Sequence, residues 1–123
     1  MSKKVLIVDD APVVRLLLKS ILEKNGFEVV AEAGNGNEAL DRYKDSSPDV
    51  VTMDITMPEA NGIEGVKMIL AHDPNAKIVM ITAIDQRKYL LEAIKAGAAD
   101  YIVKPFEDNR VITALQKATS KVL

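Results

Sequence analysis

The sequence contains no cysteine, and this absence removes several kinds of chemistry at once. Without a thiol the chain has no disulfide bond, no thiolate metal site and no cysteine nucleophile. The absence is typical of proteins of the reducing cytoplasm, where we expect this protein to act. Histidine is scarce too, because His72 is the only one and stands beside Asp73 and Pro74. We interpret it as a favourable charge at a helix C-terminus and do not expect phosphohistidine chemistry.

Long apolar runs and an excess of charge of one sign are also missing. No stretch approaches the roughly 20 apolar residues of a membrane span. The run at residues 5–8 resembles the start of a signal peptide, but it is too short and ends in two acids. The net charge of −2 argues against a broad face that binds nucleic-acid phosphates. We therefore expect a soluble monomer with no nucleic-acid or membrane partner.

Five short apolar runs alternate with segments of helical spacing over the 123 residues. Strands are predicted at residues 3–8, 27–33, 49–53, 77–81 and 100–103. The first helix should begin at Pro12 and end before Gly26, with Arg15, Lys19 and Glu23 on its polar face. Uninterrupted, β-branched strands alternating with amphipathic helices predict a single α/β domain, a parallel sheet covered by helices on both faces.

Charged residues follow three of the predicted strands directly. Asp9 and Asp10 follow the first, Asp54 the third and Lys104 the last. Ligands of such sheets bind outside the carboxyl ends of the strands, so we expect these side chains to lie together. Three carboxylates repel one another unless a cation lies between them, and Mg²⁺ prefers oxygen ligands. The pattern predicts a magnesium site, and a carboxylate in such a site can act as a nucleophile that forms an aspartyl-phosphate.

These acids also have a purely structural interpretation. Asp54 could end its strand as an ordinary turn residue. Asp9 and Asp10 could cap the helix that begins at Pro12. Two adjacent acids exceed what one cap needs, which favours the metal site.

Four motifs resemble the receiver domain of two-component response regulators, and the resemblance covers the whole chain. They are Val8-Asp9-Asp10, Asp54 with Met57-Pro58 and Gly62, Thr82-Ala83, and Tyr101 through Lys104-Pro105-Phe106. The resemblance is strongest to single-domain chemotaxis regulators of the CheY type. It implies a flavodoxin-like (βα)5 fold with strand order 2-1-3-4-5, formed by residues 1–123 without an output domain.

The resemblance implies roles for the residues of the acidic edge. Asp54 would accept the phosphoryl group. Asp10 and Asp54 would ligate Mg²⁺ directly, together with the backbone carbonyl of Thr56, while Asp9 would act through water. Lys104, joined to the following proline by a cis peptide bond, would pair with phosphoryl oxygens.

The resemblance also implies a switch. The Thr82 hydroxyl would donate to a phosphoryl oxygen and move toward it, and the ring of Tyr101 would then turn inward. This change would alter the face formed by the fourth helix, the last strand and the last helix, where we also place Leu90, Val103 and Lys117.

The function implied is that of a signalling module which takes a phosphoryl group from a sensor histidine kinase. Its partner would be the flagellar motor switch, with a phosphatase as a further partner. The chain would catalyse only its own phosphorylation and dephosphorylation, and so would not otherwise be an enzyme. A phosphorelay intermediate that passes phosphate to a phosphotransferase is the nearest alternative.

Two alternatives come from other classes of protein. A phosphatase of the haloacid-dehalogenase type would use Asp54 as nucleophile but places a second aspartate two residues later, where this chain has Thr56. A flavodoxin-like electron carrier would need a Ser/Thr-rich phosphate loop where Asp9 and Asp10 stand. A transcription factor is not expected either, since the last helix uses up the chain.

Overall fold

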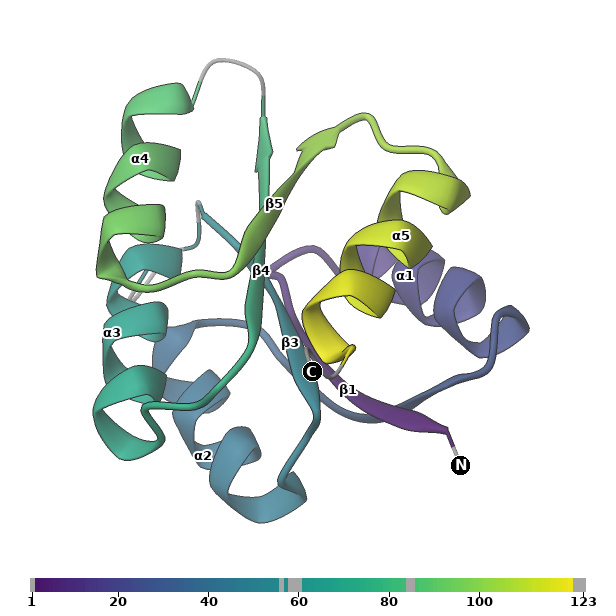
Figure 1. The fold of residues 1–123 in the computed structure, drawn as a ribbon, viewed down its shortest axis with the longest axis horizontal. Coiled ribbons are helices and arrows are strands. Elements are labelled where there is room, and N and C mark those ends of the chain that lie inside the picture. The colour runs from purple at the N-terminus through teal and green to yellow at the C-terminus, as the bar shows by residue number, and fades with distance from the viewer. Residues whose placement is uncertain (1, 56, 58–60, 84–85, 121–123) are drawn as a thin grey trace.

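Helices cover both faces of a parallel five-stranded sheet in the computed structural model (Figure 1), which describes residues 2–55, 57, 61–83 and 86–120. The strands are β1 (Lys3–Val8), β2 (Phe27–Ala33), β3 (Val50–Asp54), β4 (Ile78–Ala83) and β5 (Asp100–Lys104). The helices are α1 (Pro12–Lys24), α2 (Gly36–Ser46), α3 (Gly62–His72), α4 (Arg87–Ala96) and α5 (Asp108–Thr119). The strand order is β2-β1-β3-β4-β5, and every pair is parallel. The predicted fold is confirmed.

Alternate residues of the central strands supply two separate cores. Leu6, Met53 and Met80 pack with α2, α3 and α4, whereas Ile7, Val79 and Ile81 pack with α1 and α5. Figure 1 shows α1 and α5 together on one face and the other three helices on the opposite face. Both faces of the sheet are therefore buried, which explains the uninterrupted apolar runs. Within the described ranges, no helix is long and apolar enough to cross a membrane.

Three strands continue further than the apolar runs predict. β3 includes Asp54, which pairs with Ile81, β4 includes Thr82 and Ala83, and β5 includes Lys104. The pairing continues because backbone groups, which every residue carries, form the ladder regardless of side-chain polarity. Asp54 and Thr82 thus sit on rigid strand backbone.

The start of α3 packs directly on the end of β3. Asn61 caps α3 in a reciprocal capping box with Glu64, and the amide of Gly62 donates to the Ile55 carbonyl at 2.9 Å. A Cβ atom at Gly62 would collide with the Asp54 carbonyl oxygen and lie 2.8 Å from Cα of Ile55. Glycine at this position allows the helix to approach the backbone of Asp54.

We predict that Gly62→Ala lowers the free energy of unfolding by about 1–3 kcal/mol, because the backbone of β3 or α3 must move to admit the methyl group. Urea denaturation measures this change. Gly34→Ala is the matched control, since its Cβ would lie 3.7 Å from the closest atom, Oε1 of Glu38. Equal stabilities for the two variants would contradict the close packing of α3 on β3.

Candidate functional site at the carboxyl edge of the sheet

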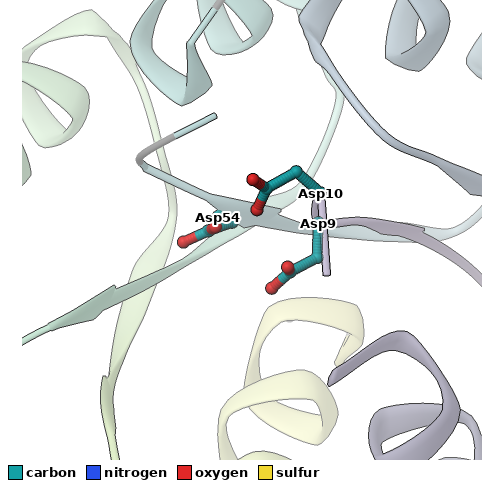
Figure 2. A group of neighbouring side chains, drawn as sticks. All are labelled: Asp9, Asp10 and Asp54. Carbon is teal, nitrogen blue, oxygen red and sulfur yellow. The ribbon is translucent and has the colours of Figure 1, made fainter. Parts of the chain in front are cut away.

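Three carboxylates meet where β1 and β3 end (Figure 2). Asp9 and Asp54 are buried, with 1% and 5% of their surface exposed, while Asp10 is exposed. One carboxylate oxygen from each of the three lies within 4.8 Å of the others. The parallel strands hold the acids at this separation because neighbouring strands end side by side. The structure thus brings together the acids that the sequence placed at one edge.

Lys104 reaches the same edge from the end of β5. Its Nζ atom lies 3.5 Å from Oδ1 of Asp54 and 3.6 Å from Oδ2 of Asp9. The peptide bond between Lys104 and Pro105 is cis, as the family resemblance implies. The lysine side chain is 31% exposed, so water screens its charge more than it screens the two buried acids. One ammonium therefore offsets only part of the negative charge.

The pKa of Asp54 is raised from 3.8 to about 6. Burial is the largest cause, because the ionised carboxylate loses water. The charge of Asp9 raises the pKa further, Lys104 opposes the shift, and Asp10 adds a smaller increase. Asp54 is consequently ionised at neutral pH, but its ionisation in the folded protein costs free energy. A second cation near the carboxylate would lower that cost.

Asp9 is oriented by its own loop. Its Oδ1 atom accepts a hydrogen bond from the amide of Ala11 at 2.9 Å, and Ala11 itself is the N-cap of α1. The side chain of Ala11 forms no cap hydrogen bond, so this contact gives partial support to the capping interpretation of Asp9. It engages only Oδ1, and Oδ2 of Asp9 remains at the acidic edge, 3.6 Å from Nζ of Lys104.

A divalent cation fits this arrangement. Oδ2 of Asp9 is buried and accepts no hydrogen bond from the part of the chain that the structure describes. The Lys104 ammonium lies 3.6 Å from this oxygen, close enough to offset part of its charge but beyond hydrogen-bond distance, so a bound cation would further lower the cost of its burial. The oxygen-only set of Asp9, Asp10 and Asp54 matches the ligand preference of Mg²⁺. Thr56, the fourth expected ligand, lies outside the described residues.

Thr82 is buried beside the acidic edge, but its hydroxyl makes local contacts. Oγ1 donates to the Ala83 carbonyl at 3.0 Å and lies 3.5 Å from Oε1 of Gln86. The same Gln86 oxygen accepts from the Ala83 amide at 2.9 Å. A phosphoryl contact by Thr82 would therefore require its hydroxyl to leave these partners.

A cavity of about 220 Å³ lies behind Thr82. Leu90, Tyr101 and Val103, all expected on the switch face, line it together with Thr82, Ala83 and Arg87. Tyr101 is 41% exposed, so its ring points outward next to this space. Lys117 does not line the cavity and lies exposed in the last turn of α5.

Sequence reasoning missed three side chains around the site. Gln86 contacts Thr82, Arg110 donates to the Tyr101 carbonyl, and Arg15 donates to the Asp9 carbonyl. Each of these side chains contacts a hydroxyl or a backbone oxygen, and the sequence pattern does not predict such contacts. Only the position of Arg15, one turn into the helix after Asp10, weakly indicated a place near the acids.

Comparison with known proteins agrees with this geometry. Residues 5–116 match the family model of the response regulator receiver domain. The chain is 56% identical to chemotaxis protein CheY of Thermotoga maritima, over 97% of this chain and 99% of that protein. It is 54% identical to chemotaxis protein CheY of Bacillus subtilis, over 95% and 98%.

A solved structure has the same fold. The CheX–CheY–BeF3–Mg²⁺ complex from Borrelia burgdorferi matches with a TM-score of 0.91 and 34% identity, over 97% of this chain and 90% of that one. The family model and the relatives each cover nearly all of this chain. The chain therefore belongs to the response regulator receiver domains and is a CheY-like member of that family.

Proposed function

We propose that this protein accepts a phosphoryl group on Asp54 from a sensor histidine kinase, with Mg²⁺, and controls the flagellar motor switch. The observation that carries the proposal is a buried carboxylate whose pKa is raised to about 6, flanked by two more acids and by Lys104. Such a group is a nucleophile in a site arranged for added positive charge.

The chain's own residues account for most of the reaction. An Asp54 carboxylate oxygen would attack the phosphorus atom, and the bond between phosphorus and the donor would break. Bound Mg²⁺ would neutralise charge on the transferring oxygens. The Lys104 ammonium, now 3.5 Å from Asp54, would pair with a phosphoryl oxygen after transfer. Beyond its own phosphorylation and dephosphorylation, the proposal assigns the chain no enzyme activity.

The output of the site would pass through Thr82 to Tyr101. A phosphoryl oxygen would draw the Thr82 hydroxyl from Gln86, and the ring of Tyr101 would occupy the cavity behind it. The altered surface would lie on α4, β5 and α5.

We infer the motor switch as partner from the names of the similar proteins. Two of them carry the name chemotaxis protein CheY, and the Borrelia CheY is bound to CheX in its solved complex. These names favour a chemotaxis role over a phosphorelay intermediate. The proposal places the protein in the cytoplasm, with the motor switch as target and a phosphatase as a further partner.

We predict that phosphorylation occurs on Asp54 and requires a divalent cation. Incubation with acetyl phosphate and Mg²⁺ should add one phosphoryl mass, located on Asp54 by peptide mapping, and chelator should abolish it. Asp54→Asn should remove the adduct, whereas Asp41→Asn, which neutralises an exposed acid on α2, should keep it. An adduct on another residue, or full labelling with chelator present, would disprove the assignment.

We predict that Thr82→Ala accepts phosphate, because it keeps the nucleophile and the acids. The loss of the hydroxyl should weaken the effect of phosphorylation on Tyr101. The readout is the NMR shift of the Tyr101 ring on addition of Mg²⁺ and beryllofluoride. Couplings of this kind are typically about 1–3 kcal/mol. Thr82→Ser, which retains the hydroxyl, is the matched control. Equal shifts of the Tyr101 ring in the wild type and both variants would show that Thr82 is not part of the switch.

We predict that Asp10→Asn and Asp54→Asn raise the metal-free melting temperature at pH 7.5 and weaken Mg²⁺ binding. Each substitution removes a like charge from the edge. For Asp54 the gain should be about 1–3 kcal/mol, or several degrees, from the raised pKa. Added Mg²⁺ should stabilise the wild type much more than either variant.

The raised pKa of Asp54 determines how the stability gained by Asp54→Asn depends on pH. Below pH 3.8 Asp54 is protonated in both folded and unfolded chains, so it does not lower the free energy of unfolding. Between pH 3.8 and about 6 only the unfolded chain releases the proton, so stability falls as pH rises. The advantage of Asp54→Asn should therefore vanish near pH 4. Variants that melt below the wild type at pH 7.5 would mean that the acids stabilise the fold.

A further inference from the structure

Arg15 links three elements next to the acidic edge. Its Nη1 atom donates to the backbone carbonyl of Asp9, and its Nε atom donates to Oε1 of Glu32 at 3.1 Å. Glu32 lies near the end of β2, beside β1. The Arg15 side chain is only 21% exposed, so this guanidinium is packed and does not extend into water. It ties α1 to the ends of β1 and β2.

The oxygen that Arg15 holds belongs to the peptide unit between Asp9 and Asp10. The Asp9 amide donates to the Ala33 carbonyl at 3.0 Å, and Oδ1 of Asp9 accepts from Ala11 at 2.9 Å. With Arg15 on its carbonyl, Asp9 has both backbone groups and one carboxylate oxygen engaged. Oδ2 faces the site: it is buried, accepts no hydrogen bond from a described residue, and lies 3.6 Å from Nζ of Lys104.

We propose that Arg15 is a positioning residue for the metal site, fixing the Asp9–Asp10 peptide so that both carboxylates face Asp54. The inference rests on the proposed function, because it concerns the affinity of the Mg²⁺ site. The planar guanidinium suits the task, since it binds the carbonyl and Glu32 from fixed directions. Partners that orient metal ligands in this way are typically worth about 10–100-fold in affinity.

The charge of Arg15 acts in the opposite direction. Arg15 and Asp10 line the same depression, of about 340 Å³, so the guanidinium lies near an acid of the metal site. A nearby cation repels Mg²⁺, and by charge alone its removal should strengthen binding. Positioning predicts the reverse, that removal weakens binding. The sign of the change in affinity therefore separates the two effects.

The experiment measures Mg²⁺ affinity of the metal-free full chain by NMR titration, well below the melting temperature. Arg15→Met keeps the length of the side chain but removes donors and charge, and should weaken binding about tenfold. Arg15→Lys, which keeps one donor and the charge, should fall between Arg15→Met and the wild type. Arg42→Met, at an exposed site on α2, makes the same change in net charge and should not weaken binding.

An Arg15→Met protein that binds Mg²⁺ as tightly as the wild type, or more tightly, overturns the inference even if its melting temperature falls. The proposed function then still stands, provided that the wild type binds Mg²⁺ and is phosphorylated on Asp54. A wild type that does not bind Mg²⁺ overturns both. Should Arg15→Met not fold, Glu32→Gln frees one side of the guanidinium and should weaken binding more than Glu38→Gln, which removes the same charge from the same depression. A loss for Glu32→Gln that is no larger than the loss for Glu38→Gln overturns the inference.

Discussion

Repulsion among three carboxylates governs the carboxyl edge of this sheet. Asp9 and Asp54 are buried on adjacent strands, and Asp10 completes a cluster whose oxygens lie within 4.8 Å. Folding forces these charges together because the strand ends are fixed by apolar pairing beneath them. The single ammonium of Lys104 is partly exposed and shared between two acids, so it cannot balance the cluster. The fold therefore holds a cluster of like charges that a bound cation would stabilise.

Neighbouring strands connect the acidic edge to the surface formed by α4 and β5. Asp54 ends β3, Thr82 lies on the neighbouring strand β4, and Tyr101 lies on β5 beyond it. Gln86 joins the Thr82 hydroxyl to the start of α4. In the proposed switch, the ring of Tyr101 would occupy the cavity behind Thr82. A change of charge at Asp54 would then reach α4 and β5 through these neighbours.

Arginines act on this path from outside the acidic cluster. Arg15 donates to the Asp9 carbonyl next to the acidic cluster, and Arg110 donates to the Tyr101 carbonyl next to the cavity. Arg110 also lies 5.9 Å from the centre of the Tyr101 ring, within the range of a cation–π contact. Each arginine contacts the backbone of a residue whose position matters for the proposed function, Asp9 or Tyr101.

The sequence by itself determined the fold and the members of the acidic edge. Apolar runs and helical spacing specify the order of strands and helices, and parallel strands must end at one edge, which brought Asp9, Asp10, Asp54 and Lys104 together. The strand order followed from the family resemblance.

Only the tertiary structure decided how these side chains are held. Sequence analysis placed Arg15 on the polar face of its helix, whereas the structure packs it against the Asp9 carbonyl and Glu32. The raised pKa of Asp54 likewise depends on burial and on charges from other strands. Periodicity states which face of an element is apolar, but hydrogen bonds and desolvation depend on distances between atoms far apart in the chain, and these exist only after the elements have packed.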